Sequence, residues 1–239
     1  MTMPKRRLLY SLVPLLLAAL AFLVLRGRLG GTSPTAQTLR AWFQSPEARP
    51  TLISRLSAPC PNAPFLLPST GFVGFLYGDP TAPYTPLAPH TGIDIFGDGA
   101  VGTVPVYAAY DGYLTRLPEW RSSLIIRHPN DPLQPDRQIW TYYTHMASEN
   151  GAQSYIVDDF PPATSEKFVR RGTLLGYQGL YSGAAYRIGL HVHFSVVLSE
   201  PDGSFRNETQ IGNTLDPSPY LGFNVDARRN PTIPIRCGS

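Results

Sequence analysis

The sequence predicts a mainly β protein, built as an antiparallel β-sheet or sandwich and preceded by an N-terminal transmembrane helix. The 239 residues include 25 prolines and 21 glycines, a composition that favours short strands and turns over long helices. From about Phe65, short apolar runs alternate with Gly, Pro and Asp at the spacing typical of an antiparallel β domain. An all-helical bundle does not fit this pattern.

The N-terminal segment predicts a membrane anchor. Residues 8–25 carry no formal charge, follow three basic residues at 5–7 and are followed by two arginines. As a helix this stretch would be about 27 Å long, close to the thickness of the hydrocarbon layer. The basic flank keeps the N-terminus in the cytoplasm and the rest of the chain outside it. We therefore expect residues 1–28 to be an anchor of a single-pass cell-membrane protein, or a signal peptide that would leave a secreted one.

Charge argues against a nucleic-acid partner. Five of the 20 basic residues lie within the first 28 residues, which contain no acid, so the remaining 15 face 17 acidic residues. A nucleic-acid-binding protein carries its positive charge on the folded domain, as a patch or a stripe. No basic run follows residue 28, and we exclude nucleic acid as a partner.

Three further segments follow the anchor. We expect residues 29–64 to be a stalk or linker with a short helix in 35–57 interrupted at Pro50, residues 65–222 to be the functional domain, and residues 223–239 to be a tail. Within the domain, the alternation of apolar residues predicts strands at 104–109, 112–117, 124–128, 139–145, 173–176 and 191–198. Residues 129–137 and 148–166 are polar and rich in turn residues, so we expect loops there.

The two cysteines predict a disulfide. Cys60 and Cys237 bracket most of the chain after the anchor, and cysteines outside the cytosol tend to pair. We expect a bridge between them, with two unpaired thiols as the alternative.

The strand at 191–198 presents two histidines on one face. Side chains alternate along a strand, so Val192, Phe194, Val196 and Leu198 form an apolar face, and His191 and His193 share the opposite one. Two neighbouring imidazoles on one face are able to serve a single metal site, although a lone His-x-His pattern is a weak signal.

A second cluster supplies further ligand types. His90 and Asp94 are separated by Thr91-Gly92-Ile93, and Gly92 accepts positive φ, which would let the chain bend and bring both side chains together. With one histidine of the strand they make a three-ligand site. Such a site keeps a position open for water, as hydrolysis requires.

The remaining histidines have separate interpretations. His145 ends the strand at 139–145, where it could contact a metal-bound water or a substrate carbonyl. His128 ends an apolar strand and is expected to be structural or solvent-exposed.

Residues from about 68 to 221 resemble the lysostaphin-like, LytM-like zinc endopeptidases that cleave peptidoglycan cross-links. The resemblance rests on the ordered motifs at 90–94, 105–109 with 111–112, 143–146, 172–176 and 191–194. It implies a β-sandwich of the duplicated hybrid motif type and a peptidoglycan peptide as the substrate. It also implies Zn²⁺ bound by His90, Asp94 and His193, with His145 and His191 as the catalytic pair. Val192 and Met146 stand where the family pattern has Leu, and the loops 129–137 and 148–166 depart from it.

Other functions fit the sequence less well. A non-hydrolytic wall-binding or activator module on the same fold stays open, although all five implied positions are filled. A two-His, one-carboxylate iron oxygenase is disfavoured because His90 and Asp94 are four residues apart, not two. The His-Glu-x-x-His motif is absent, which excludes that type of metalloprotease. The Gly-x-Ser-x-Gly motif is absent as well, although other serine hydrolases stay open. The sequence does not say which bond is cut.

Overall fold

The computed structural model describes residues 33–184 and 186–238. The predicted anchor at residues 1–28 lies outside the described residues. Among the helices of the described ranges, none combines the length and apolar character needed to span a bilayer.

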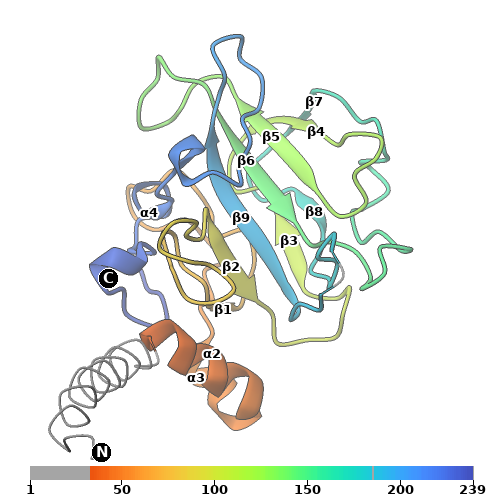
Figure 1. Ribbon diagram of the computed structural model, residues 1–239. Coiled ribbons are helices and arrows are strands. Elements are labelled where there is room, and N and C mark those ends of the chain that lie inside the picture. The colour runs from red at the N-terminus through yellow and green to blue at the C-terminus, as the bar shows by residue number, and fades with distance from the viewer. Residues whose placement is uncertain (1–32, 185, 239) are drawn as a thin grey trace, which may run out of the picture.

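Antiparallel strands form most of the regular secondary structure in the described residues (Figure 1), which confirms the predicted mainly β class. The strands are β1 (Phe72–Val73), β2 (Ile93–Phe96), β3 (Pro105–Tyr107), β4 (Gly112–Thr115), β5 (Leu124–His128), β6 (Ile139–Thr144), β7 (Lys167–Val169), β8 (Leu174–Tyr177), β9 (His191–Leu198) and β10 (Thr214–Leu215). The large sheet has the order β1-β2-β9-β6-β5-β4-β7, with β10 also paired to β9, and β3 and β8 form a small second sheet.

The longest strand, β9, lies between β2 and β6. The register of these three strands aligns residues of the candidate site. Asp94 of β2 and Thr144 of β6 both lie opposite His193 in the two ladders. The alternation expected for this strand is confirmed, since Val192, Phe194 and Val196 are fully buried in the main hydrophobic core. Packing of this apolar face fixes the register, because a slip by one residue would turn the histidines into the core.

The predicted strands agree with the structure to different degrees. The bounds of β5 and β9 are as predicted, and those of β3, β4, β6 and β8 differ by one or two residues at an end. Four strands were not predicted: β1, β2, β7 and β10. They are two to four residues long.

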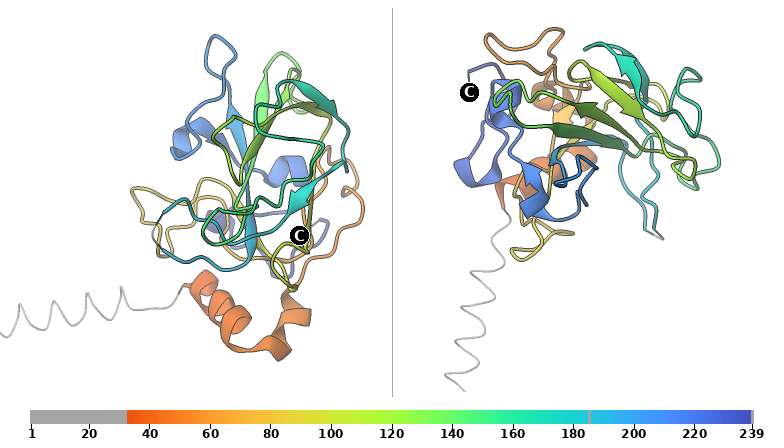
Figure 2. Two further views of the ribbon diagram at one scale, coloured as in Figure 1. Left: turned by 90° about the vertical axis from the view of Figure 1, so that its right-hand side faces the viewer. Right: turned by 90° about the horizontal axis from the view of Figure 1, so that it is seen from above.

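Residues 33–52 are helical and pack on the edge of the large sheet. α2 (Pro34–Gln44) is followed by the 3₁₀ turn η1 (Pro46–Ala48) and by α3 (Arg49–Leu52), and Figure 2 shows these helices together at one end of the molecule. Trp42 is buried against Phe72, with ring centroids 5.4 Å apart. The expected interruption at Pro50 was wrong: the helix breaks at Pro46, and Pro50 lies in the first turn of α3, where its missing N–H is not needed.

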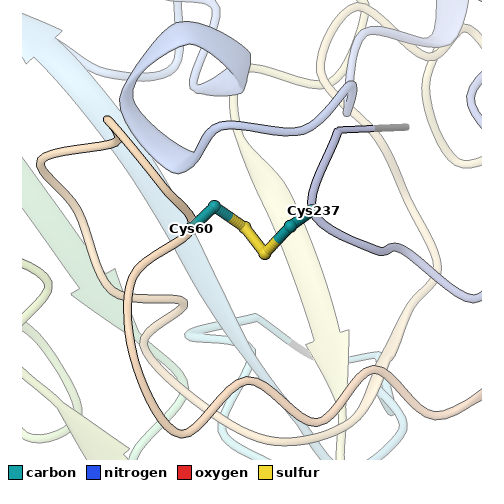
Figure 3. The surroundings of a disulfide bond; sticks show 2 residues. All are labelled: Cys60 and Cys237. Carbon is teal, nitrogen blue, oxygen red and sulfur yellow. A yellow bond between two sulfur atoms is a disulfide. The ribbon is translucent and has the colours of Figure 1, made fainter.

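The C-terminal residues are tied to the segment that follows the helices. They contain η2 (Ile211–Asn213), α4 (Ser218–Leu221) and η3 (Ala227–Arg229). Cys60 and Cys237 form a disulfide with Cα atoms 5.3 Å apart (Figure 3), which confirms the predicted pair. Ile235 is buried, and its N–H donates to Ser54 Oγ at 2.9 Å.

Candidate metal centre

Three side chains from two neighbouring strands converge on one point. His90 lies just before β2, Asp94 lies within β2 and His193 within β9, and all three are buried. His193 Nδ1 is 2.9 Å from Asp94 Oδ1, and His90 Nε2 is 2.9 Å from His193 Nδ1 and 3.2 Å from Asp94 Oδ1. The structure therefore brings together the three residues proposed from the sequence as metal ligands.

The local backbone explains why His90 reaches this point. Its N–H donates to Asp79 O at 3.0 Å, and its ring Nδ1 donates to Leu76 O at 3.1 Å. The second bond places the ring proton on Nδ1. Nε2 is then unprotonated, as a metal ligand must be, and it faces Asp94 and His193.

Gly92 has a different role from the one expected. It is not among the glycines with positive φ. A Cβ at this position would lie 2.3 Å from the carbonyl oxygen of Phe194 in β9. Glycine is thus required here by the close approach of β2 to β9, and the expectation of a positive φ was wrong.

The electrostatics of the cluster favour a cation. Burial alone would raise the pKa of Asp94, but His90, His191 and the hydrogen bond from His193 lower it well below its usual range. Burial lowers the pKa of His193, yet the hydrogen bond to Asp94 and the nearby carboxylate of Glu208 raise it to about 10. In the metal-free protein a proton on His193 therefore partly balances the carboxylates.

Glu208 is a neighbour of the site that the sequence analysis missed. Its Oε2 is 3.6 Å from His193 Nε2, the nitrogen that faces away from Asp94, and it accepts a hydrogen bond from Thr91 Oγ1 at 3.2 Å. Glu208 lies in the segment between β9 and η2, which shows no motif. Only the folded structure relates this residue to His193.

His145 and His191 lie side by side next to the cluster. Their ring centroids are 4.5 Å apart, and His191 Nε2 is 3.6 Å from Asp94 Oδ2. Each ring donates through Nδ1 to a backbone carbonyl, His145 to Tyr181 at 2.7 Å and His191 to Gly189 at 2.8 Å. Both rings therefore keep Nε2 for other partners.

His145 and His191 are neutral near pH 7. Burial is the main cause, and it lowers the pKa of His145 to about 3 and also lowers that of His191. His145 follows β6 with φ at 76°, a conformation uncommon for a residue other than glycine. Such backbone strain is typical of functional positions.

His128 lies apart from this cluster. It is buried, its Nδ1 donates to Asp111 O at 2.8 Å, and Thr141 Oγ1 donates to its Nε2 at 2.9 Å. Both ring nitrogens are satisfied, which agrees with a structural role. Of the two expected alternatives, structural or solvent-exposed, the first is the one observed.

The donor set fits a zinc ion. Two imidazole nitrogens and one carboxylate oxygen are ligands that Zn²⁺ accepts, and the three ligand atoms lie within 4.8 Å of one another. Asp94, His145 and His191 also line a cavity of about 360 Å³. A substrate bound in that cavity would therefore lie beside the three-ligand cluster.

Comparison with known proteins gives structural matches only. No family model and no curated protein sequence matches the chain. The catalytic domain of the antimicrobial peptidase lysostaphin from Staphylococcus simulans is 20% identical over 62% of this chain and 90% of that chain, with a TM-score of 0.41.

Two further matches have comparable scores. Complete lysostaphin is 18% identical over 67% of this chain but only 49% of that chain, with a TM-score of 0.38. A variant of the catalytic domain of EnpA, a prophage-encoded M23 protein from Enterococcus faecalis, is 24% identical over 65% of this chain and 98% of that chain, with a TM-score of 0.32. These three matches cover 62 to 67% of this chain.

Proposed function

We propose that the protein is a zinc-dependent endopeptidase that hydrolyses peptide bonds in peptidoglycan stems or cross-bridges. One observation carries the proposal: a three-ligand cluster lies beside a pair of neutral histidines, and Asp94 of the cluster lines the same cavity as both histidines of the pair. His90 and His193 would hold zinc through Nε2 and Nδ1, and Asp94 would hold it through Oδ1.

The protein's own groups supply the positioning and the proton transfer. Zinc bound at the cluster would lower the pKa of water toward about 7 and polarise the scissile carbonyl. His145 and His191 each use Nδ1 to hold a fixed orientation, so each presents Nε2 as the atom that takes or gives a proton. Their low pKa values keep them in the form that accepts a proton.

The compartment follows from the disulfide and the N-terminal sequence. A Cys60–Cys237 bond is typical of an oxidising compartment outside the cytosol. We propose that residues 8–25 anchor the chain in the cell membrane and that residues 33–238 act outside it. The same placement would result for a secreted chain if the N-terminal segment were cleaved.

Zinc content and muropeptide release test the proposed function together. The full chain, purified in detergent, should hold about one zinc and release soluble fragments from isolated cell walls. His193→Ala should lose both zinc and release. The matched control is Glu166→Gln, an exposed residue paired with Arg127 at the other end of the sheet. A folded wild-type chain that binds zinc without releasing fragments would instead favour the non-hydrolytic module.

A further inference from the structure

One wall of the cavity at the metal centre comes from outside the catalytic sheet. Besides the site residues Asp94, His145 and His191, the cavity is lined by apolar side chains, among them Phe75, Phe96 and Ile188. Phe43, the last residue but one of α2, also lines it. Helix α2 thus contributes directly to the space in which a substrate would bind.

Several contacts fix α2 in this place. Leu39 and Trp42 are buried in a cluster with Phe72 and Phe96. Thr35 Oγ1 donates to Asp79 Oδ2 at 2.6 Å near the start of the helix, and Arg49 Nε donates to Trp42 O at 2.9 Å near its end. These contacts fix the position of α2 against the edge of the sheet.

On α2, the Phe43 side chain stays partly exposed to solvent. It remains 49% exposed although its neighbour Trp42 is 2% exposed. Its ring packs edge-on against Phe96 at 5.5 Å, and Phe96 in turn stacks on His191 at 4.9 Å. Gly189 lies directly beside it, since a Cβ there would be 2.6 Å from the Phe43 ring.

The charges of the residues that line the cavity limit the kind of substrate side chain that can bind there. Apart from Asp94 and the two histidines, the ionisable lining residues in the described part of the chain are Tyr84, Tyr186 and Arg187. Tyrosine hydroxyls, with an ordinary pKa of about 10, are neutral near pH 7. Arg187 is largely exposed and pairs with Glu149 at 2.6 Å. The interior of the cavity thus offers an apolar surface and no free charge for a charged side chain.

We propose that Phe43 is a specificity-determining residue that binds an uncharged, apolar side chain next to the scissile bond. In wall peptides this side chain is the methyl group of alanine, and a glycine bridge offers no equivalent group. The inference rests on the proposed function, because it names the substrate class of the same site. Apolar burial against the Phe43 ring is the physical basis of the preference.

The test compares two muropeptides, one cross-linked through D-alanine and one through pentaglycine. The wild-type full chain should cleave the alanine-linked substrate with a kcat/KM roughly tenfold higher, since one methyl group in an apolar pocket is worth about 10- to 200-fold. Phe43→Ala should raise KM for this substrate, leave zinc content unchanged and reduce the preference. Phe43→Leu keeps an apolar surface and should retain most of the preference for the alanine-linked substrate.

Phe168→Ala is the matched control, because Phe168 is similarly exposed, at 54%, but lies on β7 at the other edge of the sheet. Equal kinetics for Phe43→Ala and Phe168→Ala, or a wild-type preference for pentaglycine, would overturn the inference and leave the proposed function intact. A zinc-loaded wild-type chain that cleaves neither substrate would contradict the proposed function itself, and the inference with it.

Discussion

Two buried histidines in the same sheet, His128 and His193, differ strongly in pKa. Burial lowers the pKa of His128 to about 4, and its two partners are a backbone carbonyl and a hydroxyl. His193 is equally buried, but the hydrogen bond to Asp94 and the nearby carboxylate of Glu208 raise its pKa to about 10. The difference teaches that carboxylates converging on a histidine, and not its burial, distinguish a cation site from a structural one.

Removing the carboxylate of Asp94 should have the largest effect on the difference between the two histidines. Asp94→Asn keeps the shape of the side chain but removes the charge that faces both His90 and His193. We expect zinc binding and wall hydrolysis to be lost, because an amide oxygen is a poor zinc ligand compared with a carboxylate. Metal content and fragment release measure this, and an Asp94→Asn variant that retained both would remove Asp94 from the ligand set.

The structural histidine should be visible in the pH dependence of stability. The unfolded chain protonates His128 near pH 6.5, but the folded chain does so only near pH 4. Acid therefore favours the unfolded state, and the free energy of unfolding should fall by up to about 3 kcal/mol between these pH values. Above pH 6.5 this contribution should be constant.

Urea unfolding of the zinc-loaded protein at pH 7, 5.5 and 4 measures the effect. His128→Gln does not titrate, so its stability should fall by about 3 kcal/mol less than that of the wild type over the same range. Equal losses in both proteins would show that protonation of His128 does not matter. The other histidines are common to both proteins and cancel in this comparison.

The smallest expected effect is that of changing Glu208, whose carboxylate lies next to the proposed metal ligand His193. Glu208 lies beside Nε2 of His193 and accepts a hydrogen bond from Thr91. A partner on the second nitrogen orients a metal-binding imidazole, and its loss typically weakens metal affinity 10- to 100-fold. We therefore expect Glu208→Gln to weaken zinc binding by about tenfold, toward the low end of that range because the amide still fills the space.

Competition with a chromogenic chelator measures this affinity. Glu166→Gln is the control, since it removes another glutamate carboxylate, which pairs with Arg127 and lies far from the metal centre. The role assigned to Glu208 would be refuted by an affinity equal to that of the control. A loss of thermal stability in the metal-free variant with no change in affinity would make Glu208 a purely structural residue.

The comparison also shows what could be predicted from the sequence. The strand at His191–Leu198 alternates polar and apolar residues from His191 to Val196, and its bounds and the shared face of its two histidines were predicted. The ligand types could be named because His90, Asp94 and His193 occur in recognisable local patterns. These signals are contained in short stretches of chain.

Other features depend on contacts between distant segments. Glu208 reaches His193 from a loop without a motif, and Phe43 reaches the cavity from a helix expected to belong to a stalk. Gly92 was expected to provide a bend, but the structure requires it for the approach of another strand. No local pattern reports such proximity, because each case depends on segments that are far apart in the sequence and meet only in the folded chain.

The disulfide has a consequence for resistance to proteolysis. Cys60 and Cys237 are 177 residues apart in sequence, so the bond spans all ten strands and the five residues at the site. A single cut by a protease anywhere between them, for example in the largely exposed stretch at 162–168, would leave the two pieces covalently joined. The nicked protein would migrate as one band without reductant and as two bands with it. His90 and His193 would stay on the same covalent unit after such a cut.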